Sequence, residues 1–234
     1  MTESSPVKAI VTDIEGTTTS ISFVADVLFP YAKARIQDYV VENAAVPAVA
    51  AEISAVRAEA GEPDASVERV GEILVSWIEQ DLKITPLKTL QGMIWRSGYE
   101  DGSLKGHLYP EVATKLKGWK QQGIQLSIYS SGSEAAQKLL FGYSEAGDLT
   151  PLFDHFFDTR IGGKRESASY EQIKQTLGLP GHEILFLSDV VAELDAAAEA
   201  GVLTVALDRE CIGEGFGAHT HVTDFNQINL AALR

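Results

Sequence analysis

Two acidic residues follow an apolar run near the start of the chain. The run Val7-Lys8-Ala9-Ile10-Val11 predicts a buried strand, and Asp13, Glu15 and Gly16 come shortly after it. Strand alternation predicts that Asp13 and Glu15 point to one side, at the strand end where parallel sheets bind ligands. Neighbouring carboxylates repel each other, so a fold keeps them together for a cation or for chemistry. The alternative is a strand followed by an ordinary polar turn.

Polar residues also end two later apolar runs. Residues 124–129 predict a strand that leads into Ser130-Ser131-Gly132-Ser133, and residues 183–187 predict one that leads into Ser188-Asp189. If the three strands are neighbours, Asp13 and Asp189 meet at one sheet edge with hydroxyl groups between them. Such carboxylates suit Mg²⁺, which leaves room for phosphate oxygens. The chemistry indicated is attack of an aspartate on phosphorus, followed by hydrolysis of the aspartyl-phosphate.

A phosphate site also needs a fixed cation. Lys164 follows the pair Gly162-Gly163, which favours close passage of the backbone past a ligand, and Arg165 is the rival candidate. By default such a lysine is a solvated loop residue. The serines likewise suit a turn in which Ser133 caps a helix at Glu134, although a helix N-terminus also binds anions.

Acidic and histidine residues elsewhere receive smaller roles. Glu193 is expected to support the site through other residues, and Asp195 to be structural, because acids near a helix start favour its dipole. No histidine is assigned a role, since their spacing matches no helical metal-ligand pattern; the segment His219-Thr220-His221 is expected to be a loop.

The elements that position these residues alternate between helix and strand. From Tyr109 onward, the sequence predicts helices over residues 110–122, 134–143, 169–177 and 190–200, and strands over 124–129, 153–157, 183–187 and 202–207. This order predicts an α/β fold with a doubly wound parallel sheet. Residues 1–20 and 107–234 form the expected core domain, and residues 21–106 an inserted all-helical domain.

The inserted block shows helical spacing of its apolar residues. Residues 47–60 predict a solvated, alanine-rich helix, and Asp64 or Ser66 is expected to cap the next one. A further helix is expected to start near Pro86 and to end before Gly98.

Composition excludes several classes of protein. The chain has 234 residues and a formal net charge of −14, which argues against nucleic acid or an anionic membrane as the main partner. Cys211 is the only cysteine, so an intrachain disulfide is impossible and a reducing compartment is expected. We expect a soluble cytoplasmic protein, because the sequence shows neither a signal peptide nor an apolar run of bilayer length.

The motifs together resemble those of the haloacid dehalogenase superfamily of Mg²⁺-dependent phosphatases. Its four motifs match Asp13, Ser130 or Ser131, Lys164 and Asp189, in this order along the chain. Most phosphatases of the superfamily carry D-x-D in the first motif, whereas this chain has Asp13-Ile14-Glu15. That departure resembles the enolase-phosphatase (acireductone synthase) family of methionine salvage, as do Leu90-Gln91-Gly92-Met93-Ile94-Trp95 and Gly106-His107-Leu108-Tyr109.

The resemblance implies a reaction and roles for the matched residues. The family converts 2,3-diketo-5-methylthiopentyl-1-phosphate to an acireductone, by enolisation and then loss of phosphate, with one Mg²⁺ per subunit and usually as a monomer. It implies that Asp13 is nucleophile and metal ligand, that Asp189 is a metal ligand, and that Glu15 gives a backbone carbonyl to the metal and its side chain to proton transfer. Ser130, Ser131 and Lys164 would bind the phosphate.

The helical block would then be a cap over the site. Phe23, Trp95 and Tyr99 are the cap residues that we expect to contact an apolar methylthio group. The alternative is that each of them simply packs in a helix core. Two other functions stay open: a phosphatase of the same fold that acts on another small phosphate ester, and a non-catalytic switch module phosphorylated on aspartate.

Overall fold

The chain folds as two compact units. A computed structural model describes residues 7–233. One unit comprises Met1–Ile21 and Gly106–Arg234, and the other comprises Ser22–Lys105. Each boundary lies one residue from the position expected from the sequence.

The core unit contains a six-stranded sheet, counted over the described residues, with the order β3-β2-β1-β4-β5-β6. Every neighbouring pair in it is parallel. The strands are β1 (Ala9–Thr12), β2 (Gln125–Tyr129), β3 (His155–Phe157), β4 (Ile184–Ser188), β5 (Leu203–Leu207) and β6 (Thr220–Val222). The predicted parallel α/β architecture is therefore confirmed.

The register places the predicted site residues at one edge of this sheet. Strand β1 lies between β2 and β4, and Thr12 pairs with Ile128 on one side and with Leu187 on the other. Asp13 follows β1, and its N–H donates to the carbonyl of Leu187 at 2.9 Å. The three polar strand ends expected to converge are consequently neighbours.

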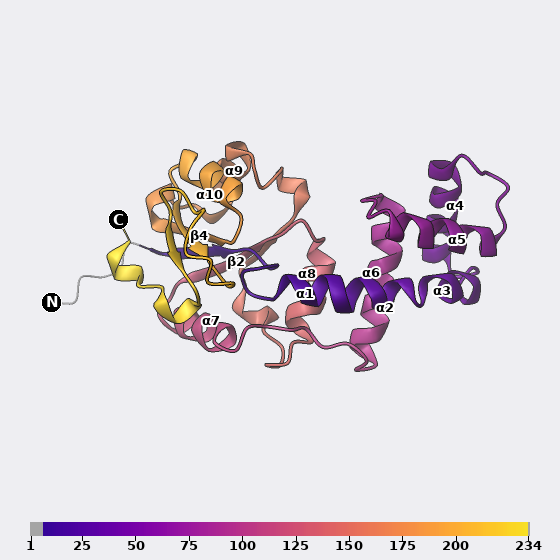
Figure 1. Ribbon diagram of the computed structural model, residues 1–234, viewed down its shortest axis with the longest axis horizontal. Helices are drawn as coiled ribbons and strands as arrows, with labels where there is room; N and C mark the ends of the chain where they lie inside the picture. The colour runs from indigo at the N-terminus through magenta and orange to yellow at the C-terminus, as the bar shows by residue number, and fades with distance from the viewer. Residues whose placement is uncertain (1–6, 234) are drawn as a thin grey trace. The chain divides into compact units, whose positions relative to one another are not determined.

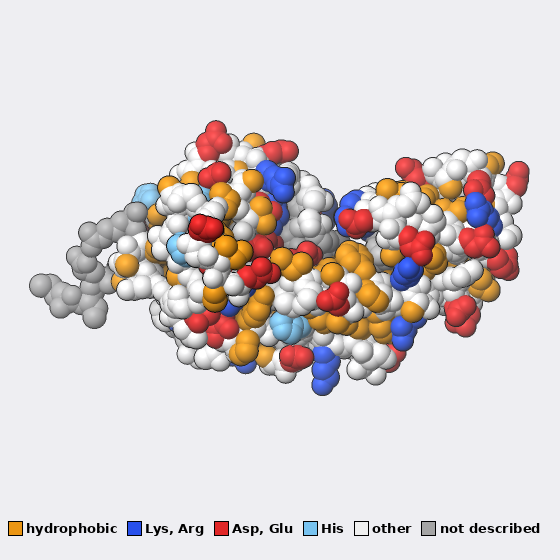
Figure 2. Space-filling model, viewed as in Figure 1, with side chains coloured by type: hydrophobic (Ala, Val, Ile, Leu, Met, Phe, Trp, Pro, Cys, Tyr) orange, Lys and Arg blue, Asp and Glu red, His pale blue; other side chains and the backbone are white. Residues whose placement is uncertain are grey.

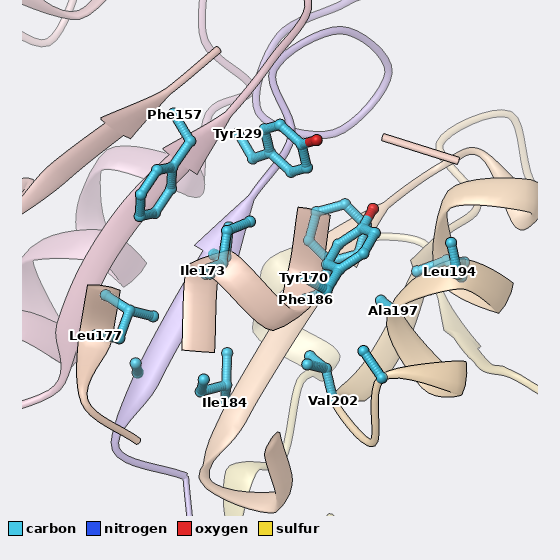
Figure 3. Close-up of a cluster of buried hydrophobic side chains, with 14 of the residues drawn as sticks. Tyr129, Phe157, Tyr170, Ile173, Leu177, Ile184, Phe186, Leu194, Ala197 and Val202 are labelled. Atoms are coloured by element: carbon cyan, nitrogen blue, oxygen red, sulfur yellow. The ribbon is translucent and has the colours of Figure 1, made fainter. Parts of the chain in front are cut away.

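Helices cover both faces of the sheet. Helices α9 (Ser167–Leu177) and α10 (Val191–Glu199) lie on one side, and α7 (Val112–Gln121) lies on the other (Figure 1). Helix α8 (Glu134–Gly142) begins after Ser133, whose side chain accepts from the N–H of Ala136 as predicted for a cap. A buried cluster between the sheet and α9 and α10 includes Tyr129, Tyr170 and Phe186 (Figure 3).

The helical unit has a separate core. Its elements are α1 (Ile21–Phe23), the π-helical turn η1 (Val24–Leu28), α2 (Phe29–Lys33), α3 (Ile36–Glu42), α4 (Pro47–Ala60), α5 (Val67–Glu79) and α6 (Thr85–Glu100). Ser66 caps α5 by accepting from the N–H of Arg69, so of the two expected caps the serine is the one used. Acidic side chains are spread over the visible face of both units (Figure 2).

Two predictions about the helical unit were wrong. Helix α4 is not merely solvated, because Val49, Ile53 and Val56 are buried in the core of the unit. Their i, i+4, i+7 spacing was obscured by the alanines around them. Helix α6 does not end before Gly98 but continues to Glu100. Gly98 is accommodated inside the helix because its missing side chain leaves space for the hydroxyl group of Tyr31.

The segment His219-Thr220-His221 is not a loop. Thr220–Val222 form strand β6, which pairs with β5 at the edge of the sheet. The strand has three residues and buries only Val222, so the sequence shows too short an alternation to predict it. His219 is structural here: its ring contacts Thr204 Oγ1 at 2.7 Å and Asp195 Oδ1 at 2.9 Å. Asp195 is thus also structural, as expected.

Among the described residues, no single helix is long and apolar enough to cross a membrane. One helix pair, Ile36–Glu42 with Pro47–Ala60, reaches the required length and composition only when taken together, with a bend of 119° between its members.

A substitution at Gly181 tests how tightly the backbone is packed at the amino ends of the strands. A Cβ at this position would overlap the carbonyl of Gly201, which is backbone and cannot rotate away. We expect Gly181→Ala to lower the free energy of unfolding by about 1–3 kcal/mol, measured by chemical denaturation.

Gly118→Ala is the matched control, because nothing lies within 4 Å of a Cβ at that helical position. It should raise the free energy of unfolding by about 0.5–1 kcal/mol, as alanine is the better helix former. Equal stability of the two variants would contradict the close packing at Gly181.

Candidate active site

Asp13 is buried at the end of β1 and is held through both carboxylate oxygens. Its Oδ1 accepts from the N–H of Ile14 at 2.7 Å, and its Oδ2 lies 2.7 Å from Nζ of Lys164. The side chain of Asp13 is 7% exposed and that of Lys164 is 11% exposed. One oxygen is therefore fixed by the backbone and the other by a buried ammonium group.

A tight turn follows Asp13. The carbonyl of Ile14 accepts from the N–H groups of Thr17, Thr18 and Thr19, and the hydroxyl of Thr18 donates to the carbonyl of Asp13 at 3.2 Å. Because β1 ends at Thr12, the expected strand alternation does not extend to Glu15. Asp13 is buried whereas Glu15 is exposed, so the two carboxylates have different environments.

Lys164 is the cation of the site, and the rival Arg165 is exposed. The ammonium of Lys164 lies between two carboxylates, at 2.7 Å from Asp13 Oδ2 and 2.6 Å from Glu193 Oε2. Glu193 also accepts from the hydroxyl of Ser188 at 3.0 Å. Glu193 thus supports the site through Lys164, in agreement with the supporting role expected from the sequence.

Burial is the largest single influence on the pKa of Asp13 and on that of Lys164. Loss of solvent raises the pKa of Asp13 to about 6, against the opposing attraction of Lys164 and with added repulsion from Glu193. The pKa of Lys164 is also raised: burial acts to lower it, but the two carboxylates together outweigh that effect. At neutral pH Asp13 is consequently ionised and Lys164 protonated, which is the state that a nucleophilic carboxylate needs.

Asp189 follows β4 and lies against Gly16. A Cβ on Gly16 would overlap the Asp189 carboxylate, and the φ of +68° at Gly16 is one that glycine adopts without strain. Burial raises the pKa of Asp189, with Glu193 and Glu15 adding repulsion. Its Oδ1 is buried and has no hydrogen-bond partner among the described residues. A buried carboxylate oxygen without a partner is costly, so this atom requires a cation or a donor.

The residues around Asp189 fit a magnesium ion. Asp13 and Glu193 contact the ammonium of Lys164, and Asp189 lies near enough for Lys164 and Glu193 to influence its pKa. Three carboxylates thus share one ammonium, and two negative charges remain uncompensated. Within residues 7–233 no group of three or more His, Cys, Asp or Glu residues is arranged to hold a metal. Mg²⁺ does not need such a group, because it commonly takes one or two carboxylates and keeps several waters.

The predicted phosphate-binding serines follow β2, next to Asp13. Ser130 is buried, and its Oγ accepts from the N–H of Gly132 at 3.1 Å. Ser131 is exposed. The buried amide of Gln137 fixes this turn by donating to the carbonyls of Gly132 and Phe157, both at 2.8 Å. The structure therefore brings Asp13, Ser130 and Asp189 to the ends of the adjacent strands β1, β2 and β4, and Lys164 reaches Asp13 from a loop.

Arg209 supports the site and was not predicted. Its guanidinium donates twice to the carbonyl of Thr17, at 3.1 and 2.6 Å, and once to Glu111 at 2.6 Å. It also lies over the ring of Tyr109, 4.0 Å from the ring centroid. A single arginine near the end of the chain carries no sequence signal that would link it to a turn almost two hundred residues earlier.

The three cap residues suggested as substrate contacts lie in the helical unit. Phe23 and Tyr99 are buried, and the indole N–H of Trp95 donates to the carbonyl of Leu28 at 2.8 Å.

A substitution at Gly16 tests whether a cation binds at Asp189. We expect Gly16→Ala to weaken Mg²⁺ binding at least about tenfold, because the new methyl group displaces the Asp189 carboxylate, and isothermal titration calorimetry measures the change. Gly178→Ala is the matched control, since Gly178 has a φ of +67° with nothing within 4 Å of its Cβ position. Both variants should lose about 1–2 kcal/mol of stability from backbone strain, but only the first should lose Mg²⁺ affinity.

Comparison with known proteins agrees with this geometry. The haloacid dehalogenase-like hydrolase family matches residues 7–201. The protein named enolase-phosphatase E1 from Pseudomonas aeruginosa (strain UCBPP-PA14) is 59% identical over 222 residues, covering 95% of this chain and 98% of the relative. Its namesake from Azotobacter vinelandii is 55% identical over 227 residues, covering 97% of this chain and 99% of the relative.

Solved structures give the same result for the fold. The UTR4 protein of Saccharomyces cerevisiae is 31% identical with a TM-score of 0.81, covering 95% of this chain and 100% of that one. A dehalogenase at 18% identity, with a TM-score of 0.57, shares the fold. With two aspartates at adjacent strand ends and a lysine that reaches the first of them from a loop, this chain belongs to the haloacid dehalogenase-like hydrolases and, among them, to the enolase-phosphatase family.

Proposed function

We propose that this enzyme is a Mg²⁺-dependent enolase-phosphatase of L-methionine salvage. It converts 2,3-diketo-5-methylthiopentyl-1-phosphate to 1,2-dihydroxy-3-keto-5-methylthiopentene and phosphate. The observation that carries the proposal is the buried contact of Asp13 with Lys164, beside an Asp189 that lacks a partner for one oxygen. The names of the relatives and the departure from D-x-D at Glu15 support the enolase half of the reaction.

Asp13 is the nucleophile of the phosphatase step. One of its carboxylate oxygens attacks phosphorus, the bond between phosphorus and the ester oxygen breaks, and the electron pair leaves with that oxygen. Lys164 faces the attacking carboxylate at 2.7 Å, where its charge also offsets that of the incoming phosphate. The N–H of Ile14 orients Asp13, and the hydroxyl of Ser130, at the end of the neighbouring strand, would bind a phosphate oxygen. Water then hydrolyses the aspartyl-phosphate.

Glu15 is the candidate for proton transfer. Enolisation removes a proton from the carbon that bears the phosphate ester and delivers a proton to the neighbouring carbonyl oxygen. Glu15 is exposed beside the buried Asp13, on a stem one carbon longer than that of aspartate. An exposed carboxylate keeps its ordinary access to solvent protons, which suits a group that must be reloaded in every cycle.

Asp13, Asp189 and the backbone carbonyl of Glu15 would hold the magnesium ion. When bound, Mg²⁺ neutralises charge on the phosphate and on the nucleophile so that the two can approach. The unpartnered Asp189 oxygen and the two uncompensated negative charges support this assignment.

Two alternatives remain distinguishable from this proposal. Another phosphatase of the fold would act on a different small ester and would not need Glu15 in place of aspartate. A switch module phosphorylated on Asp13 would stop after one phosphoryl group. We further infer a monomer whose partner is the small phosphorylated diketone, located in the cytoplasm in keeping with a single cysteine.

The direct test supplies the diketone phosphate together with Mg²⁺. Repeated turnover should release phosphate while the ultraviolet absorbance of the enediol rises, and a chelator should stop both. Turnover of generic esters without any enediol absorbance would favour the first alternative, and a single phosphoryl transfer would favour the second.

Asp13→Asn should abolish phosphate release, because the amide is a poor nucleophile. The variant should stay folded and unfold at a temperature no lower than the wild type at pH 7 without metal. The folded pKa of about 6 lies above the ordinary value, so ionisation of Asp13 costs stability as pH rises through that window. At pH 4 this advantage of the variant should disappear. Thermal scans and phosphate assays check both results, and retained turnover would remove Asp13 from its role.

Glu15→Ala should slow conversion of the diketone phosphate by roughly 10²–10⁴-fold, the usual contribution of general acid–base catalysis. Hydrolysis of p-nitrophenyl phosphate should fall by less than about tenfold, because its leaving group departs without a proton. Parallel rate measurements compare the two substrates, and equal losses on both would argue against a role in enolisation.

A further inference from the structure

Three consecutive backbone carbonyls of the loop that carries Lys164 accept from buried hydroxyl groups. Tyr129 donates to Gly162 at 3.0 Å, Ser169 to Gly163 at 2.8 Å, and Tyr170 to Lys164 at 2.7 Å. We call Tyr129, Ser169 and Tyr170 the hydroxyl clamp. Tyr129 ends β2, whereas the other two lie in α9, so the loop is tied to two separate elements.

The members of the hydroxyl clamp are fixed by the core. Tyr129 is 0% exposed, and Ser169 and Tyr170 are each 1% exposed. The two phenol rings meet edge to face at 5.7 Å, and Tyr170 meets Phe186 at 5.1 Å. Both phenol oxygens lie at one margin of the buried cluster (Figure 3). Burial raises the pKa of both tyrosines, so at neutral pH both hydroxyls keep the protons that they donate.

The loop itself has little intrinsic rigidity. It begins with Gly162-Gly163, and glycine has more backbone freedom than any other residue. Gly162 adopts a φ of +127°, and a Cβ there would overlap the hydroxyl of Ser169. The glycine therefore allows the close approach of that hydroxyl, and the hydroxyl in turn restricts the glycine-rich backbone.

The position of Lys164 matters because its ammonium is held between Asp13 and Glu193 at 2.7 and 2.6 Å. The hydroxyl clamp contacts neither carboxylate. We propose that Tyr129, Ser169 and Tyr170 are positioning residues that hold the backbone of residues 162–164 so that the Lys164 ammonium stays against Asp13. The effect of the hydroxyl clamp on catalysis rests on the proposed phosphatase function. The restraint that it places on Lys164 does not depend on that function.

The test removes one hydroxyl at a time with the least change in shape, by Tyr129→Phe, Tyr170→Phe and Ser169→Ala. The first readout is the rate at which acetic anhydride acetylates Lys164 in the metal-free full chain. Peptide mass spectrometry reports it relative to Lys138, an exposed lysine on α8. The second readout is kcat for p-nitrophenyl phosphate with Mg²⁺.

Two variants control for loss of a buried hydroxyl and for weakening of the core. Ser127→Ala removes a hydroxyl that is 0% exposed and has no hydrogen-bond partner among the described residues. Ile173→Val removes a methylene group from the same buried cluster. Neither residue belongs to the hydroxyl clamp or to the proposed site.

We expect each clamp variant to acetylate Lys164 about fivefold faster, the change in loop release that one lost hydrogen bond of ordinary strength produces. We expect kcat to fall about tenfold or more, since displacement of a reacting or binding group by about 1 Å can cost 10²-fold. Both controls should stay within about twofold of the wild type on both readouts.

The two readouts separate the possible failures. Unchanged acetylation in the clamp variants, or an equal rise in the controls, overturns the positioning role. Faster acetylation with unchanged kcat leaves the restraint on Lys164 in place and overturns its consequence for catalysis. Faster acetylation in a chain whose wild type hydrolyses no phosphate ester leaves the restraint in place and overturns the proposed phosphatase instead.

Discussion

The contact between Asp13 and Lys164 is the constraint on which the rest of this structure depends. A buried carboxylate is costly, and here burial raises its pKa in spite of the adjacent ammonium. The fold tolerates the arrangement because Lys164 also faces Glu193, and Glu193 is in turn bound by Ser188. Every loop at this edge of the sheet serves to keep these groups in place.

The turn after Asp13 is held by several contacts within the core unit. Thr17 is bound by Arg209, the carbonyl of Thr18 accepts from the N–H of Tyr109 at 3.0 Å, and the hydroxyl of Thr19 contacts His107 at 2.8 Å. Tyr109 and His107 lie just after the point where the chain returns from the helical insertion. The segments on either side of the insertion are thus hydrogen-bonded to each other within the core unit.

The same principle governs the other loops of the site. Gln137 restrains the turn after Ser130, and the hydroxyl clamp restrains the loop that carries Lys164. In each case buried polar side chains from helices, and from β2 in the case of Tyr129, bind backbone carbonyls of a functional loop. Such contacts satisfy backbone groups that would otherwise be buried without partners, and they make short glycine-containing loops as rigid as the elements beside them.

The parallel α/β class, the position of the helical insertion and the order of the four motifs could all be predicted from the amino-acid sequence. This was possible because strands and helices have distinct apolar periods and because Asp13, Ser130 and Asp189 each follow a recognisable strand. The sequence also narrowed the candidate cation of the site to Lys164 or Arg165. Strand alternation predicted that the carboxylates of Asp13 and Glu15 point to the same side of the sheet.

Other features became visible only in the folded chain. The difference in burial showed that Lys164, and not the exposed Arg165, is the cation of the site. Because β1 ends at Thr12, Asp13 and Glu15 have different environments. The structure also showed the edge strand β6, the buried face of α4, and the supports from Arg209 and the hydroxyl clamp. These features depend on contacts between residues far apart in the chain or on isolated side chains, and neither leaves a periodic signal in the sequence.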